Sequence, residues 1–163
     1  MKILISPAKS LDFQKSLPTE RFTEPNFIDE AIHINSILNK KSPKALQKLM
    51  NISEKLAQLN WDRNQKFSLT ESKEQKKRAA IFAFNGDVYS GFDVYTLTEE
   101  KIDKMQTQLR ILSGLYGMLR PLDQIQPYRL EMGTKISIGS NNDLYSFWKK
   151  KVTEQLKVEL KKD

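Results

Sequence analysis

The chain has 163 residues, of which 39% are hydrophobic, and this length is enough for one domain with a buried core. It has no cysteine and one histidine, which excludes disulfides, thiolate metal sites, cysteine nucleophiles and metal centres built mainly from imidazole. Lysine and arginine number 27 against 20 acids, a net charge of +7 that favours a polyanionic partner. The sequence shows no secretory signal and no long apolar run, so we expect a cytoplasmic protein that does not enter a membrane.

The N-terminal part of the chain predicts a strand and then a helix. Residues 2–6, "KILIS", form a short β-rich run that Pro7 ends. Apolar residues then recur at helical spacing across 27–38, which predicts an amphipathic helix. The single histidine, His33, lies off the apolar stripe of this helix, so we expect it in solvent.

Two shorter helices are expected next, in a segment crowded with lysine. Ser42 is a good cap and Pro43 suits the first position of a helix. A break at 51–53 separates this helix from another that runs to about Asn60. Residues 38–60 contain five lysines and one glutamate, so the pair of helices carries a local positive charge. Residues 64–78 are polar and basic, which indicates a solvated loop with some helix.

The second half of the sequence predicts two strands and two helices. "AAIFAF", residues 79–84, reads as a buried strand ended by "NGD". A helix capped by Thr98 precedes a third strand, "RILSG", and a final amphipathic helix begins at Asp143. Strands that alternate with helices predict an α/β fold with a central, mostly parallel sheet and flanking helices. We expect one domain over residues 1–163.

Uncommon residues follow each predicted strand, where an open parallel sheet places its ligand crevice. Glycines at 114 and 117 would let a ligand approach the backbone closely, and arginine, lysine and acidic side chains would line the site. The candidate pocket residues are Lys9, Asp87, Tyr89, Tyr116, Arg120, Arg129 and Glu131. A second interpretation is open at this point: the glycines form turns, the arginines form surface ion pairs and the tyrosines are core residues.

The two lysine-rich helices resemble a helix-hairpin-helix motif. Leu49, Ile52 and Ala57 fit its spacing, while Asn51 and Ser53 stand where the motif has glycines. Backbone N–H groups at the start of the second helix would point at a DNA phosphate. The candidate DNA-binding residues are Lys44, Lys48, Ser53 and Lys55. The alternative is an ordinary helical hairpin with a solvated lysine face.

Four segments have a distinctive order and spacing: "ILISPAKSLDF", "FNGDVYSG", "LRILSGLYGMLRPLDQIQPYRLEMGT" and "DLYSFW", of which the third is the most specific. Together they resemble the YaaA family of bacterial peroxide stress proteins. Chains of this family extend well past the point where this sequence stops, so we expect the sequence to cover the N-terminal part of the family's length, either as an incomplete version of the longer fold or as a short relative.

The resemblance implies a cytoplasmic protein of the oxidative stress response that binds double-stranded DNA and limits damage by iron and hydroperoxide. It implies no established catalytic reaction, cofactor or metal. An enzyme or small-anion-binding protein that uses the predicted crevice is the alternative. The sequence does not define the oligomeric state.

Overall fold

The computed structural model describes residues 1–70 and 76–162, which form two compact units. Unit 1 is built from three separated segments, Met1–Asn26, Lys76–Leu112 and Met118–Pro127. Unit 2 contains the described residues of Phe27–Gln75, Ser113–Gly117 and Tyr128–Asp163. Along the chain, segments of unit 1 alternate with segments of unit 2, so each unit is built from three separate stretches of sequence. The expectation of one domain over 1–163 stays a prediction.

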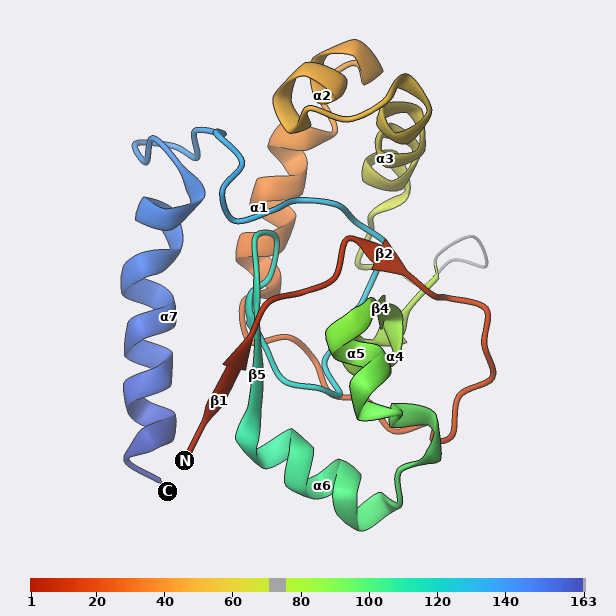
Figure 1. Cartoon of the computed structure of the whole chain (residues 1–163). Coiled ribbons are helices and arrows are strands. Elements are labelled where there is room, and N and C mark those ends of the chain that lie inside the picture. The colour runs from red at the N-terminus through yellow and green to blue at the C-terminus, as the bar shows by residue number, and fades with distance from the viewer. Residues whose placement is uncertain (71–75, 163) are drawn as a thin grey trace. The chain divides into compact units, whose positions relative to one another are not determined.

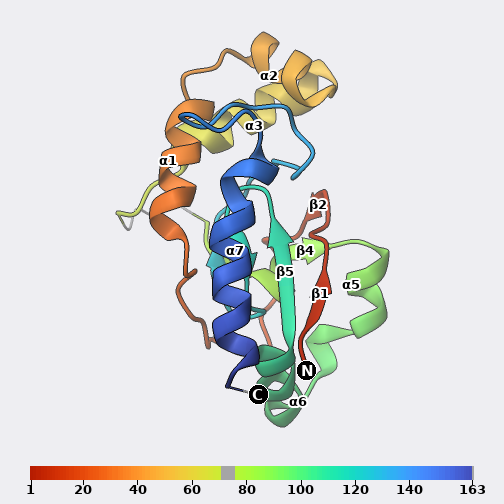
Figure 2. The same ribbon diagram turned by 90° about the vertical axis from the view of Figure 1, so that its left-hand side faces the viewer.

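Unit 1 has mixed α/β structure with small sheets. The largest sheet has three strands in the order β1 (Ile3–Ile5), β5 (Leu109–Ser113) and β6 (Gly117–Leu119). β1 and β5 are parallel, with Ile3 opposite Leu109, and they run side by side in both views (Figures 1 and 2). Two antiparallel pairs join β2 (Ser10–Leu11) with β4 (Phe84–Asn85) and β3 (Arg78–Ala79) with β7 (Gln124–Ile125).

The helices of unit 1 are short, apart from the one before β5. α6 (Glu99–Gln108) begins at Thr98, whose hydroxyl accepts a hydrogen bond from the Lys101 N–H at 3.4 Å, so the predicted cap is confirmed. The other helical segments are α4 (Ala80–Ala83), α5 (Asp87–Phe92) and the 3₁₀ turn η1 (Val94–Thr96).

The predicted strand at 79–84 is wrong for most of its length. Residues 80–83 form the one-turn helix α4, with two-residue strands on either side. Every side chain from Ala79 to Phe84 is buried, and a short run that is apolar on all sides has no period that separates a buried strand from a buried helix. Because this predicted strand is largely replaced by a helix, the largest sheet of the described residues is small and only partly parallel, whereas we expected a central, mostly parallel sheet.

Unit 2 is mainly helical, with α1 (Ile28–Leu38), α2 (Pro43–Met50), α3 (Glu54–Lys66) and α7 (Leu144–Leu160). The α2–α3 hairpin lies beyond the C-terminal end of α1 (Figures 1 and 2). The inner stripe of α1 is buried, whereas His33 is exposed as predicted. α7 starts with a capping box, in which the Asp143 carboxylate accepts the Ser146 N–H at 2.7 Å.

Candidate nucleic-acid interface

The connection between α2 and α3 is a tight, well-capped turn in unit 2. Asn51 ends α2 in the left-handed conformation, with φ of 51°, and the Ile52 N–H donates to the Gln47 carbonyl at 3.2 Å. Asparagine tolerates this conformation better than most residues, so it can replace the glycine of the motif at little cost. Ser53 caps α3, because its hydroxyl accepts the Leu56 N–H at 3.2 Å. The turn is therefore present, while its assignment as a helix-hairpin-helix motif stays a prediction.

The candidate lysines of this hairpin are solvent-exposed. Lys44 and Lys48 lie on α2 and Lys55 lies in the first turn of α3. Within residues 1–70 and 76–162, none of the three makes a hydrogen bond or ion pair. Their charges are available to an anion, and the start of α3 adds backbone N–H groups that helices direct toward phosphates.

The seven pocket candidates divide between the two units. Unit 1 holds Lys9, Asp87, Tyr89 and Arg120, and unit 2 holds Tyr116, Arg129 and Glu131. In unit 1 the β2–β4 pair aligns Ser10 with Asn85, and this register brings the segments of Lys9 and Asp87 together. Both side chains are exposed. Tyr89 is buried and donates its hydroxyl proton to the Ser6 carbonyl at 2.8 Å, so it ties α5 to the end of β1.

Unit 1 also contains a cavity of about 250 Å³ that the sequence did not reveal. Tyr89 lines it together with Asp12, Lys15, Asn85 and Tyr95. Backbone N–H groups of Gln14 and Lys15 hold the pKa of Asp12 below its usual range, so this carboxylate is charged at neutral pH. The Lys15 ammonium lies 4.0 Å from the centre of the Tyr95 ring. The aspartate itself was the available signal, because an aspartate side chain accepts hydrogen bonds from backbone N–H groups two or three residues further on and so favours this turn.

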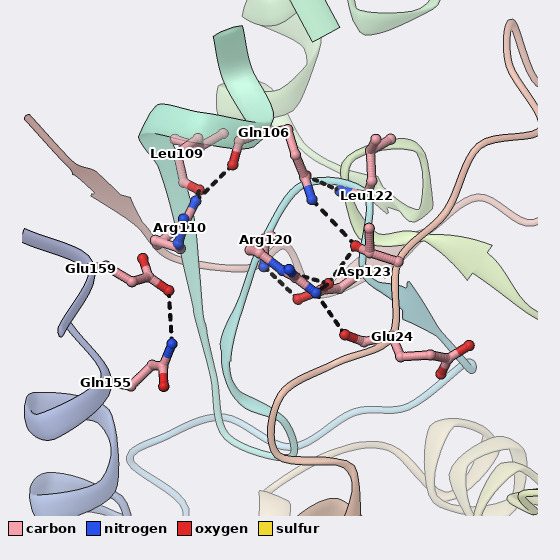
Figure 3. A network of polar contacts seen from close by, with 10 residues as sticks. Glu24, Gln106, Leu109, Arg110, Arg120, Leu122, Asp123, Gln155 and Glu159 are labelled. Atoms are coloured by element: carbon pink, nitrogen blue, oxygen red, sulfur yellow. Dashed lines mark hydrogen bonds and ion pairs between the residues drawn. The ribbon is translucent and has the colours of Figure 1, made fainter. Parts of the chain in front are cut away.

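Arg120 belongs to a structural network of unit 1 (Figure 3). Its Nε donates to Asp123 Oδ1 at 2.9 Å, its backbone N–H donates to Oδ2 at 2.7 Å, and Nη2 donates to the Glu24 carbonyl at 2.8 Å. The Thr23 hydroxyl adds a bond of 2.6 Å to the same carboxylate, which is fully buried. These bonds satisfy the acid and hold 120–123 against 23–24, so we assign Arg120 a structural role.

The candidate Tyr116, the nearby Tyr128 and the two glycines of this segment serve packing in unit 2. Tyr116 and Tyr128 are buried with their rings 5.4 Å apart, and burial raises the pKa of the Tyr128 phenol. A Cβ on Gly114 would lie 2.3 Å from the Leu130 carbonyl oxygen. A Cβ on Gly117, where φ is +71°, would lie 2.6 Å from the Trp148 ring. The close approach that these glycines permit is therefore to the protein itself.

Arg129 and Glu131 differ in environment, since Arg129 is half-buried and Glu131 is exposed. The charge of Arg129 acts on Arg63 of α3, a residue that sequence reasoning missed. No motif joins two arginines so far apart in the chain, and only the folded structure could have shown the pair. Residues 1–70 and 76–162 contain no cluster of three potential metal ligands and no helix that is long and apolar enough to cross a membrane.

The chain is a mixed α/β protein, and its helical unit presents an exposed lysine-rich hairpin and half-buried arginines. Residues 1–163 match the family described as peroxide stress protein YaaA, and the chain belongs to this family.

Relatives support the assignment along the whole chain. A UPF0246 protein of Flavobacterium johnsoniae is 53% identical over 163 residues, which cover 100% of this chain and 64% of that protein. A UPF0246 protein of Flavobacterium psychrophilum is 55% identical over 161 residues, covering 99% and 64%. A relative from Aliivibrio fischeri is 48% identical over 160 residues, covering 98% and 61%. The chain thus spans less than two thirds of these relatives.

Proposed function

We propose that this protein acts in the peroxide stress response by binding duplex DNA through the α2–α3 hairpin, and that it does so in the cytoplasm. The observation that carries the proposal is the set of exposed lysines beside the capped start of α3, which have no hydrogen-bond or ion-pair partner within residues 1–70 and 76–162. Lysine acts on phosphates as a point charge, so binding is expected to show little base preference.

Protection would follow from occupancy of the DNA. The 163 residues contain no cysteine, so no thiol of theirs can reduce a hydroperoxide. A protein that covers the duplex would limit access of iron-derived oxidants to the sugar and bases. We therefore expect plasmid nicking by iron and hydrogen peroxide to decrease as the fraction of bound DNA increases. A nicking rate that does not depend on the fraction of bound DNA would contradict this mechanism.

The decisive experiment titrates a duplex at several salt concentrations. If about four phosphates are neutralised, log K falls with log salt with a slope near −4. Lys48→Glu combined with Lys55→Glu should weaken binding to every duplex and make the slope shallower by about two. The matched control is Lys157→Glu with Lys161→Glu, two exposed lysines at the end of α7 that give the same net charge.

The control distinguishes a local site from overall charge. Equal losses in both double variants would mean that net charge, not the hairpin, governs binding. Wild-type affinity in the hairpin variant would place the DNA on another surface. Undetectable binding of the wild-type chain at low salt would remove the proposal for these 163 residues.

A second candidate, a small-anion-binding protein or an enzyme, is favoured by one observation only. Arg129 makes no hydrogen bond or ion pair within the described part of the chain. A half-buried arginine without an acid partner suits the binding of a small anion, and nothing in the described residues favours a particular reaction.

A further inference from the structure

Two half-buried guanidinium groups of unit 2, those of Arg63 and Arg129, lie in each other's electrostatic field. The pKa of Arg63 is lowered, first by burial and then by the positive charge of Arg129. Within the described residues, Arg63 makes one side-chain hydrogen bond, from Nη1 to Asn60 Oδ1 at 3.3 Å, and Arg129 makes none. The pair thus has no acid partner in the part of the chain that the structure covers.

Ring contacts join the end of α3, which carries Arg63, to the segment that carries Arg129, and they do so independently of the two charges. Phe67 follows Arg63 by one helical turn and its N–H donates to the Arg63 carbonyl at 3.0 Å. The Phe67 ring lies 6.3 Å from the ring of Tyr116, which lies 5.4 Å from that of Tyr128. Tyr128 is fixed in turn by a 2.6 Å hydrogen bond with the Ser113 hydroxyl. The end of α3 is therefore joined to the segment that carries Arg129.

The partial charge at the end of a helix explains the position of Arg63 but not that of Arg129. A cation in the last turn of a helix is stabilised by the partial negative charge at its C-terminus, which accounts for Arg63. Arg129 lies outside a helix and gains nothing from this effect. Two half-buried cations without an acid are unfavourable unless an anion joins them.

We propose that Arg63 and Arg129 form a binding site for a phosphoryl oxyanion. Guanidinium groups present paired N–H donors that match phosphate oxygens, and an anion between them would offset their repulsion. Asn64, in the same turn of α3, has a buried Nδ2 with no hydrogen-bond partner within the described residues, so this region holds a further unused donor. The site goes beyond the proposed function, because it uses none of the hairpin lysines.

The test measures thermal unfolding of the full 163-residue chain against inorganic phosphate, with chloride added to keep ionic strength constant. The melting temperature of the wild type should rise with the logarithm of phosphate concentration above Kd. Arg63→Gln and Arg129→Gln should each abolish this rise. Arg63→Lys, which keeps the charge but loses the fork, should retain a reduced response. Arg21→Gln removes an exposed arginine of unit 1 that pairs with Glu99 and Asp103, and it should respond like the wild type.

A wild type without a phosphate response, or Arg63→Gln and Arg129→Gln variants that keep it, would overturn the proposal. Duplex competition then identifies the source of the anion. If Arg129→Gln weakens duplex binding and phosphate competes with the duplex, the site holds a DNA phosphate. If duplex binding is unchanged, the site serves a free phosphate compound. Both results retain the site, and neither depends on the outcome for Lys48 and Lys55.

Discussion

Arg120 and Arg129 stand nine residues apart in one short stretch of sequence, yet the structure treats them in opposite ways. In unit 1, Arg120 is held by the fully buried carboxylate of Asp123 and by the Glu24 carbonyl. In unit 2, Arg129 has no acid partner within the described residues and lies in the field of Arg63. An arginine paired with a buried acid is neutralised within the fold, whereas an arginine in the field of another arginine keeps a charge that could serve a ligand.

The largest effect should come from Asp123→Ala, which removes the acid of the paired region. Three hydrogen bonds and one ion-pair contact from Arg120 and Thr23 end on this buried carboxylate, so its loss leaves their donors without this partner. We expect the free energy of unfolding to fall by about 4 kcal/mol, measured by urea denaturation. A loss below about 1 kcal/mol would show that Arg120 is not held as we describe.

Gly117→Ala should have the next largest effect, because unit 2 fixes its part of the stretch by packing. The new methyl group would meet the Trp148 ring at a positive φ, at a cost of about 3 kcal/mol. Gly139 also has a positive φ, of 58°, but a Cβ there would meet nothing within 4 Å. Gly139→Ala should therefore cost only about 1 kcal/mol. Equal losses in the two variants would remove the packing explanation.

The smallest change in stability is expected for Arg129→Gln, and comparing it with Arg120→Gln tests the difference between the two arginines most directly. Arg120→Gln should lower the free energy of unfolding by about 2 kcal/mol, because it leaves a buried carboxylate without its cation. Arg129→Gln should change it by no more than about 0.5 kcal/mol in the absence of phosphate, since it removes repulsion with Arg63. If Arg129→Gln destabilises the chain as much as Arg120→Gln does, Arg129 is structural and the two regions do not differ.

Local sequence signals predicted the longer helices, but not the short helices α4 and α5. Ser42, Thr98 and Asp143 each cap the helix that they were expected to begin. The first and third predicted strands are present as β1 and β5. These features depend on residues within one or two turns of each other, so the sequence contains nearly all the information that determines them.

The role of each unusual residue depended on partners far away in the chain. Gly114 and Gly117 were expected to admit a ligand, but they accommodate Leu130 and Trp148, whose positions no local pattern predicts. The period of "AAIFAF" did not distinguish a strand from a helix, because its burial on all sides arises from tertiary packing.

The sequence by itself determined the caps, the exposed lysine hairpin and the family to which the chain belongs. The sequence also contains Arg120 and Arg129, but no local pattern in it shows which of the two has its charge neutralised by an acid. That was decided when folding placed Asp123 beside Arg120 and α3 beside Arg129, because the electrostatic environment of a charge is set by the few ångströms around it and not by its neighbours along the chain.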